Sequence, residues 1–287
     1  MSTIGTVVIP CYGMASMVER ALDSVAAAIA FHRHVPFARQ GDIRIVVVDD
    51  ASPDDSADRA ILWGRRHREF EVLAIRSTRN RGAGAARNIG AGVAEGEYLW
   101  FLDADDELLP PHFAAGIVTL DNAPSVGAFC SQIEVAADIH PEWKPAIGNS
   151  SVFNLCIRRA CHEYIGGFPE TECFRLGFED IAYRLFLSAA FKLMKSDIAT
   201  VRYIWRPGNA LDRQLQKLRR PFGDRSLFGE DRAPEEVSAY IASVLRSLPQ
   251  RTDELPHGPP RRRPVDARDE WASFAGARFF DQYVVRA

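Results

Sequence analysis

Hydrophobic residues gather in short continuous runs along the first 125 residues, and longer amphipathic stretches separate these runs. Short runs rich in β-branched and aromatic residues predict strands that are covered on both faces. Apolar positions at helical spacing between them predict helices. The predicted strands are 6–10, 43–48, 71–76 and 97–102. The predicted helices are 14–31 and 82–94, together with a helix that Ser52 or Asp54 caps and that ends near residue 69, and a helix that begins at Pro110 and Pro111.

The regular alternation loosens after residue 125, and the composition changes again at Pro221. Beyond that point a helix precedes a proline-rich, charged stretch that is typical of a linker or a surface arm. We expect a short aromatic element near Phe279 and Phe280 to dock back onto the domain. The other predictions here are a strand at 126–135, irregular chain to about 150, helices at 158–166, 179–191 and 234–247, a strand at 197–205 and the arm at 248–268.

Strands that alternate with helices at this spacing predict an α/β fold with a mainly parallel central sheet. The continuous apolar strands agree, because a parallel sheet is normally covered by helices on both faces. We predict one domain over residues 1–220, followed by a partly proline-rich helical or irregular extension over 221–287. Within the domain, residues 1–125 form one half and residues 126–220 form the other.

The overall composition is that of a globular protein, with 47% hydrophobic and 25% charged residues among 287. A net charge of -3 gives no indication of nucleic-acid binding. Five scattered cysteines without metal-site spacing indicate reduced thiols in the cytoplasm. Neither a signal peptide nor an apolar stretch of bilayer length is recognisable, and peripheral contact with a membrane stays open.

Clusters of polar residues follow each of the four predicted strands of the first half. They are PCY at 10–12, VDDAS at 48–52, RSTRN at 76–80 and DADD at 103–106. The carboxyl ends of parallel strands share one edge of the sheet, where open α/β folds bind ligands. We therefore expect four side chains to converge at this edge: Tyr12, Asp50, Arg87 and Asp103.

Asp103 and Asp105 stand two positions apart at the end of a buried strand, so their side chains can point the same way. Two adjacent carboxylates repel each other, and a divalent cation would remove the conflict. Acids after a strand are also common turn formers and helix caps, and an isolated pair is more often of that kind. Asp106 and Glu107 fit this second description and are expected to cap the next helix.

Three further candidates each have a structural alternative. Asp50 either accepts hydrogen bonds from a nucleotide base or ribose, or it caps the following helix. Arg87 belongs to GAGAAR, a glycine-rich turn suited to a diphosphate, or to close packing by Ala83, Ala85 and Ala86. In GFED, Glu179 and Asp180 are either acids stabilised by the dipole at a helix N-terminus or a general base. Their apolar flanks would raise the pKa of a carboxyl group in that position.

The ordered set of these motifs resembles family 2 glycosyltransferases, which have the GT-A fold. The matching pieces run from about residue 4 to 215 and keep their order. They are VVIPCYG, VVVDDASPDDS, NRGAGAARNIGAGVAEGEYLWFLDADDELLP, GNSSVFNLCIRRACHEYIGGF and GFED. The resemblance implies an inverting enzyme that moves a sugar from a nucleoside-diphosphate sugar (UDP-, GDP- or dTDP-linked) to a hydroxyl of a glycan, lipid-linked or small-molecule acceptor.

The same resemblance implies roles for single residues. Asp103 would bind ribose or metal, and Asp105 would hold the Mn²⁺ or Mg²⁺ ion that bridges the diphosphate. Asp180 would be the catalytic base, with Glu179 beside it. The remaining implied assignments are Pro10, Tyr12, Asp50 and Arg87 for the nucleotide, and Asn149 and Gly167 for the acceptor side.

Departures from the family pattern leave alternatives open. Many relatives carry a late histidine that binds the metal, whereas YIWRPGNAL (203–211) offers Trp205 and Arg206, a residue that can contact a phosphate or face the acceptor. QLQKLRR (214–220) lacks the tryptophan of processive synthases, which predicts single addition. A non-catalytic nucleotide- or glycan-binding partner subunit is the main alternative. A nucleotidyltransferase fits less well, because PCYGMAS has no basic residue for a triphosphate.

Overall fold

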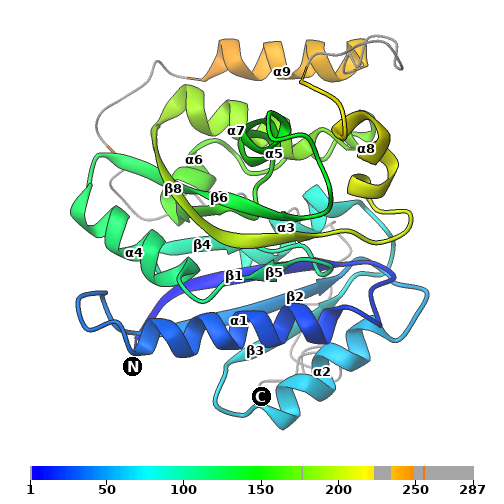
Figure 1. Ribbon diagram of the computed structural model, residues 1–287. Helices are drawn as coiled ribbons and strands as arrows, with labels where there is room; N and C mark the ends of the chain where they lie inside the picture. The colour runs from blue at the N-terminus through cyan, green and yellow to red at the C-terminus, as the bar shows by residue number, and fades with distance from the viewer. Residues whose placement is uncertain (1, 176, 223–233, 249–254, 256–287) are drawn as a thin grey trace.

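The computed structural model describes residues 2–175, 177–222, 234–248 and 255. These residues form one eight-stranded sheet in the order β3-β2-β1-β4-β7-β6-β8-β5, with helices on both faces (Figure 1). The strands are β1 Thr3–Cys11, β2 Asp42–Asp49, β3 Val72–Arg76, β4 Tyr98–Phe101, β5 Glu107–Leu108, β6 Val126–Ala136, β7 Leu155–Arg158 and β8 Lys192–Ile204. The helices are α1 Val18–Arg33, α2 Ser56–Arg66, α3 Ala83–Gly92, α4 His112–Asn122, α5 Trp143–Ser150, α6 Arg159–Tyr164, α7 Glu179–Ala190, α8 Ala210–Leu218 and α9 Glu235–Ser247, with a 3-10 turn η1 at Glu172–Phe174.

The predicted α/β fold is confirmed, and the sheet is parallel throughout its first half. β3, β2, β1 and β4 pair in parallel, whereas β7 runs antiparallel to both β4 and β6. The prediction of irregular chain up to residue 150 is wrong, because α5 lies there, and β5 and β7 were not expected. These two strands have two and four residues, too few for a period of two to show in the sequence.

Alternating residues of the central strands feed two separate hydrophobic layers. Val7 and Ile9 of β1 pack with α1, α2 and α4, whereas Val8 packs with α3, α6 and α7 on the other face. Successive side chains of a strand point to opposite faces, so a continuous apolar run is what a doubly covered sheet requires. The buried run TVVIP in the sequence is therefore the direct cause of the three-layer arrangement in Figure 1.

Glycine and alanine let α3 approach the sheet closely. A Cβ at Gly90 would lie 2.3 Å from Cγ1 of Val8 and 3.2 Å from Cγ2 of Val48. Ala85 and Ala86 are buried in the same interface, as close packing predicts. Ala83 is exposed, so the expectation of close packing is wrong at that position. This approach brings Arg87, in the middle of α3, over the carboxyl ends of the strands.

The loop after β4 crosses from the middle of the sheet to its far edge. β5 pairs antiparallel with β8, with Glu107 opposite Arg202 and Leu108 opposite Val201. The DADD motif lies in this crossing and is therefore held between β4 and the end of β8. This edge pairing places residues near 105 beside residues near 205, although about a hundred positions separate them in the chain.

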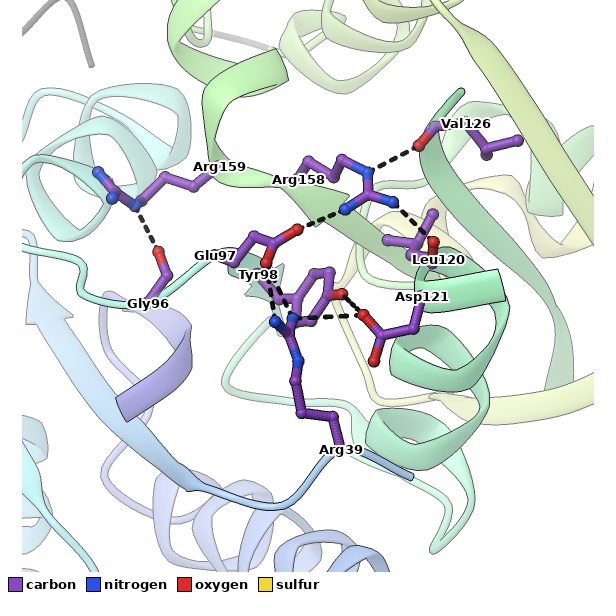
Figure 2. A network of polar contacts seen from close by, with 9 residues as sticks. All are labelled: Arg39, Gly96, Glu97, Tyr98, Leu120, Asp121, Val126, Arg158 and Arg159. Atoms are coloured by element: carbon purple, nitrogen blue, oxygen red, sulfur yellow. Dashed lines mark hydrogen bonds and ion pairs between the residues drawn. The ribbon is translucent and has the colours of Figure 1, made fainter. Parts of the chain in front are cut away.

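A polar network closes the opposite, amino end of β4 (Figure 2). The buried Arg158 pairs with Glu97 and also donates to main-chain carbonyls of α4 and β6. Arg39 contacts the same Glu97 at 3.0 Å and Asp121 at 3.4 Å, and Tyr98 donates to Asp121. The network ties both halves of the domain together, because Arg39 and Glu97 belong to the first half and Arg158 to the second.

The described part of the C-terminal extension packs on the second half of the domain. α9 buries Val237, and the Tyr240 ring lies 5.2 Å from the ring of Phe174 in η1. Figure 1 shows α9 lying across the outer side of α7. Apart from residues 248 and 255, the predicted arm at 248–268 and the aromatic element after it lie outside the described residues.

Two expectations from composition can be compared with the structure. All five cysteines are free thiols, and four of them are buried. Within the described ranges, no helix combines the length and the apolar character that crossing a bilayer requires.

We predict that Gly90→Ala lowers the free energy of unfolding by about 1–3 kcal/mol, the usual cost of inserting a methyl group into a filled interior. Gly92→Ala, two residues later in α3, is the matched control, because a Cβ there meets nothing within 4 Å. The control is expected to be neutral or to stabilise by up to about 1 kcal/mol. Urea unfolding followed by circular dichroism measures both variants, and equal effects at the two sites would contradict the close approach of α3.

Candidate functional site

Arg87 is the centre of an acid cluster at the carboxyl edge of the sheet. Its side chain is 2% exposed, and Nη2 donates to Oδ1 of Asp103 at 2.6 Å. Nη1 donates to Oδ1 of Asp180 at 2.6 Å and to Oε1 of Glu179 at 3.1 Å. One buried guanidinium thus joins three carboxylates from the loop after β4 and from the start of α7.

The buried position of Arg87 follows from the helix that carries it. One turn before it, a Cβ at Gly84 would meet Pro169, Glu179 and Phe168, so this side of α3 lies against the segment that leads into α7. The Phe168 ring lies 5.2 Å from the guanidinium carbon and closes one side. Asn88, the next residue, accepts from N of Phe168 and donates to its O, both at 2.9 Å, which fixes that ring in place.

A left-handed turn presents Glu179 and Asp180 to Arg87. Gly177 has φ +123° and Phe178 has φ +72°, a conformation that is uncommon for a residue with a side chain. The two acids then form the first turn of α7, where the helix dipole favours negative charge. This strained entry is a local cost that serves the position of the acids, as is frequent at functional sites.

The pKa of Asp180 is raised well above its ordinary value. Burial of the carboxyl is the largest cause, and the charges of Glu179 and Asp103 add to it. Arg87 acts in the opposite direction, because a nearby positive charge favours the ionised form. A quarter of the Asp180 side chain is nevertheless exposed, so an incoming group can reach it.

Asp105 points to a second arginine. Nε of Arg206, just after β8, donates to Oδ2 of Asp105 at 2.8 Å. Arg20 of α1 donates to the main-chain O of Asp105 at 2.9 Å and pairs with Glu107 at 3.1 Å. The two acids of the DAD sequence, Asp103 and Asp105, are thus each neutralised by a different arginine.

Asp106 is buried and does not cap the following helix, which corrects the expectation from sequence. It is 1% exposed, and its Oδ1 accepts from N of Ile204 at 2.9 Å. Burial, followed by the charges of Asp105 and Asp103, raises its pKa well above the ordinary value. Glu107 pairs with Arg20 and with Arg202, so it too serves the β5–β8 edge.

Asp50 holds the glycine-rich turn before α3. It is 3% exposed, and its carboxylate accepts from N of Arg81 at 2.9 Å and from N of Gly82 at 2.7 Å. Burial raises its pKa, and these two hydrogen bonds lower it in part. Pro10 is buried at the end of β1, and Tyr12 stands 49% exposed at the rim.

Side chains after β2 hold the loop that carries Tyr12. Three successive main-chain N–H groups after Tyr12 donate to Oγ of Ser52 at 3.0 Å, Oγ of Ser56 at 2.8 Å and Oδ2 of Asp54 at 3.1 Å. The prediction that Ser52 or Asp54 caps α2 is wrong, because the N-cap residue is Asp55, although Asp54 accepts from N of Ser56 at 3.1 Å. The motif VDDASPDDS therefore positions the loop after β1 as well as beginning a helix.

The two residues expected on the acceptor side lie in different surroundings. Asn149 is exposed on α5 and accepts from Nζ of Lys195 on β8 at 2.8 Å. Gly167 has φ +76°, and a Cβ there would lie 2.5 Å from Oδ1 of Asn88. Gly167 thus adjoins Phe168 and the acid cluster, whereas the contact of Asn149 is with β8.

Residue-by-residue reading of the sequence missed Arg20 and Asn88. Arg20 appears as an ordinary polar position of an amphipathic helix, and only the tertiary structure brings it to Asp105. Asn88 directly follows Arg87, which was the available signal. A pocket also opens beside the cluster, between the start of α3 and the loop before α7, and Arg81, Gly84, Pro169, Arg175 and Glu179 are among its lining residues.

Curated proteins match this chain over part of its length. The chain is 33% identical over 101 residues to "Poly(ribitol-phosphate) beta-glucosyltransferase" of Bacillus spizizenii, covering 35% of this chain and 14% of the relative. It is 33% identical over 119 residues to "Succinoglycan biosynthesis protein ExoO" of Rhizobium meliloti, covering 41% and 30%. The aligned segments thus span less than a third of the length of these two relatives.

Solved structures share the fold at low sequence identity. S. aureus TarS 1-349 in complex with UDP-GlcNAc matches with a TM-score of 0.63 at 19% identity, covering 85% of this chain and 66% of that one. The mannosyltransferase PcManGT from Pyrobaculum calidifontis, in complex with GDP-Man and Mn²⁺, matches with a TM-score of 0.55 at 18% identity, covering 85% and 72%. The predicted GT-A fold is confirmed by these similarities.

The family model described as "Glycosyl transferase family 2" matches residues 6–186. This match covers more than half of the 287 residues, runs from within β1 to within α7 and contains the whole acid cluster around Arg87. The chain therefore belongs to glycosyl transferase family 2.

Proposed function

We propose that the protein moves a sugar from a nucleoside-diphosphate sugar to an acceptor hydroxyl, with inversion at the anomeric carbon and one addition per encounter. The observation that carries this proposal is the cluster in which Arg87 joins Asp103 to Asp180 and Glu179. It links an acid of the DAD sequence to a buried carboxylate suited to a base. Family membership and the nucleotide sugars bound by the two structural neighbours support such a donor.

Asp180 takes the role of general base. The acceptor hydroxyl loses its proton to the Asp180 carboxylate as the oxygen attacks the anomeric carbon. A base works best when its pKa lies near the working pH, and burial moves Asp180 in that direction. Arg87 holds the carboxylate in place, and Glu179 beside it faces the pocket where an acceptor would lie.

The donor side is assigned to the loops after β1, β2 and β4. The proposed pocket for the nucleotide base is formed by Pro10, Tyr12 and Asp50. The Asp50 carboxylate also accepts hydrogen bonds from the main-chain N–H groups of Arg81 and Gly82.

The carboxylates of Asp103 and Asp105 fit a Mn²⁺ or Mg²⁺ ion that the donor completes. Among the described residues, no three His, Cys, Asp or Glu side chains form a metal site of their own. Hard carboxylate oxygens are nevertheless the ligands such ions prefer, and one or two carboxylates with substrate phosphates suffice. When bound, the ion would act as a Lewis acid that stabilises the departing diphosphate.

The acceptor is proposed to approach from the side of Gly167 and Glu179, with Asn149 further along the same half of the domain. A glycan, a lipid-linked sugar and a small molecule all carry the hydroxyl that the reaction needs. We also propose a cytoplasmic location, which the five free cysteines support.

We predict that isothermal titration calorimetry detects binding of at least one of UDP, GDP and dTDP, and that Mn²⁺ strengthens it. The physical reason is that a bound cation would add positive charge where the diphosphate lies near the carboxylates of Asp103 and Asp105. No binding of any of the three nucleotides, with and without Mn²⁺, would refute the proposed donor class.

We predict that Asp180→Asn lowers the turnover of the preferred nucleotide sugar by about 10²–10⁴-fold, the range that general-base catalysis supplies. Binding of the nucleoside diphosphate is expected to persist, because Asp103 and Asp105 remain. Asp197→Asn, an exposed aspartate of β8, is the matched control and is expected to keep full turnover. Full activity of Asp180→Asn would remove Asp180 from the reaction. Turnover by the purified wild-type protein would exclude the alternative of a non-catalytic partner subunit.

We predict that turnover falls on acidification at a pH above the ordinary aspartate pKa of about 3.9. Burial raises the pKa of Asp180, so the carboxylate becomes protonated, and unable to accept the acceptor's proton, at a higher pH than an exposed aspartate would. A pH profile of kcat/KM measures the position of this acid limb. A profile that stays flat down to about pH 4 would argue against a raised pKa at the base.

A further inference from the structure

Arg206 and Asp105 form an ion pair across the mouth of the proposed donor site. Nε of Arg206 lies 2.8 Å from Oδ2 of Asp105, and Nη2 lies 3.5 Å from Sδ of Met14. Met14 belongs to the loop after β1, and Asp105 belongs to the loop after β4. The guanidinium therefore contacts both of the loops that are assigned to the donor.

Separate main-chain anchors hold the two ends of this ion pair. Arg20 donates to the main-chain O of Asp105 at 2.9 Å. Asp106 accepts from N of Ile204, two residues before Arg206, also at 2.9 Å. Neither anchor uses the Arg206 guanidinium, so the backbone on both sides keeps its place when that side chain changes partner.

Arg206 is more exposed than Arg87 and pairs with fewer carboxylates. Arg87 is 2% exposed and joins three carboxylates, and its departure would leave a buried cluster of unpaired acids. Arg206 is 26% exposed and pairs with one carboxylate that is 14% exposed. The same guanidinium chemistry is thus fixed at one acid of the DAD sequence and exchangeable at the other.

A divalent cation and the Arg206 guanidinium compete for the same carboxylate. A cation that coordinates Oδ2 of Asp105 needs the position that the guanidinium occupies, and the two positive charges repel each other. A diphosphate offers the guanidinium an equivalent partner, because its planar donors match phosphate oxygens in pairs. Exchange of partners then satisfies both positive groups.

We propose that Arg206 is an exchangeable counterion of the donor site, which pairs with Asp105 until a nucleoside diphosphate enters and then moves to the diphosphate. Asp105 is thereby released to the divalent cation. This inference rests on the proposed function, since it takes the donor to be a nucleotide sugar. It follows that the cation alone binds weakly and that cation and nucleotide strengthen each other's binding by the same factor.

The test is the binding of Mn²⁺ alone, followed by the binding of UDP and GDP at saturating Mn²⁺. In Arg206→Ala the Kd for Mn²⁺ alone is expected to fall about two- to fivefold, because a competing ion pair is gone. The Kd for the nucleotide that binds wild type is expected to rise roughly ten- to a hundredfold, because a charged hydrogen-bond donor is lost. Electron paramagnetic resonance of free Mn²⁺ and calorimetry supply the two readouts.

Two further variants make the outcome decisive. Arg206→Met keeps a long, uncharged side chain and is expected to behave as Arg206→Ala does, should the smaller residue disturb folding. Arg66→Ala removes one positive charge at a side chain 57% exposed on α2, and is expected to leave both dissociation constants unchanged.

The exchange is overturned if the Arg206 variants bind Mn²⁺ alone no more tightly than wild type, or if their nucleotide affinity equals that of wild type. It is also overturned if Arg66→Ala reproduces both shifts, because a general charge effect would then explain them. Failure of wild type to bind any nucleotide sinks the proposed function itself, which keeps the two failures apart.

Discussion

The buried guanidinium of Arg87 is the interaction on which the site depends. It holds three carboxylates from two distant segments, and these acids would repel one another without it. Breaking a buried pair by removing one partner commonly costs about 3–5 kcal/mol, because the remaining charge is left unpaired. The burial of this charge is compensated by its three hydrogen-bonded carboxylates, Asp103, Glu179 and Asp180.

Two polar systems close the two ends of the central strand β4. At the amino end, Arg158, Glu97 and Arg39 tie the halves of the domain together (Figure 2). At the carboxyl end, Arg87 does the same between the loop after β4 and α7. The strand between them is four residues long and fully buried. A displacement at its amino end would therefore also move the acids at its carboxyl end. Such a frame would suit the proposed base and donor site, whose residues come from segments far apart in the sequence.

The two arginines that pair with Asp103 and Asp105 differ in how far their side chains are exposed to solvent. Arg87 is almost fully buried and belongs to the frame, whereas Arg206 is partly exposed and touches a single acid. The acids divide in the same way, because the buried Asp106 holds the end of β8, whereas Asp103 and Asp105 are partly exposed. The acids of this run therefore differ in burial, which depends on packing against β8 and is not evident from the sequence.

Sequence by itself determined the α/β fold, the four parallel strands and their polar ends, because buried strands impose long apolar runs and parallel strands end at one edge. It also marked Arg87, Asp103 and Asp180 as candidates, through the order of motifs that the family shares. Only the tertiary structure decided the hydrogen-bond partners of these side chains. Arg87 lies among carboxylates, Asp50 holds the turn before α3, and Arg206 pairs with Asp105. Those contacts join residues up to about a hundred positions apart, and their geometry follows from the β5–β8 pairing and the close approach of α3, neither of which a local pattern of residues encodes.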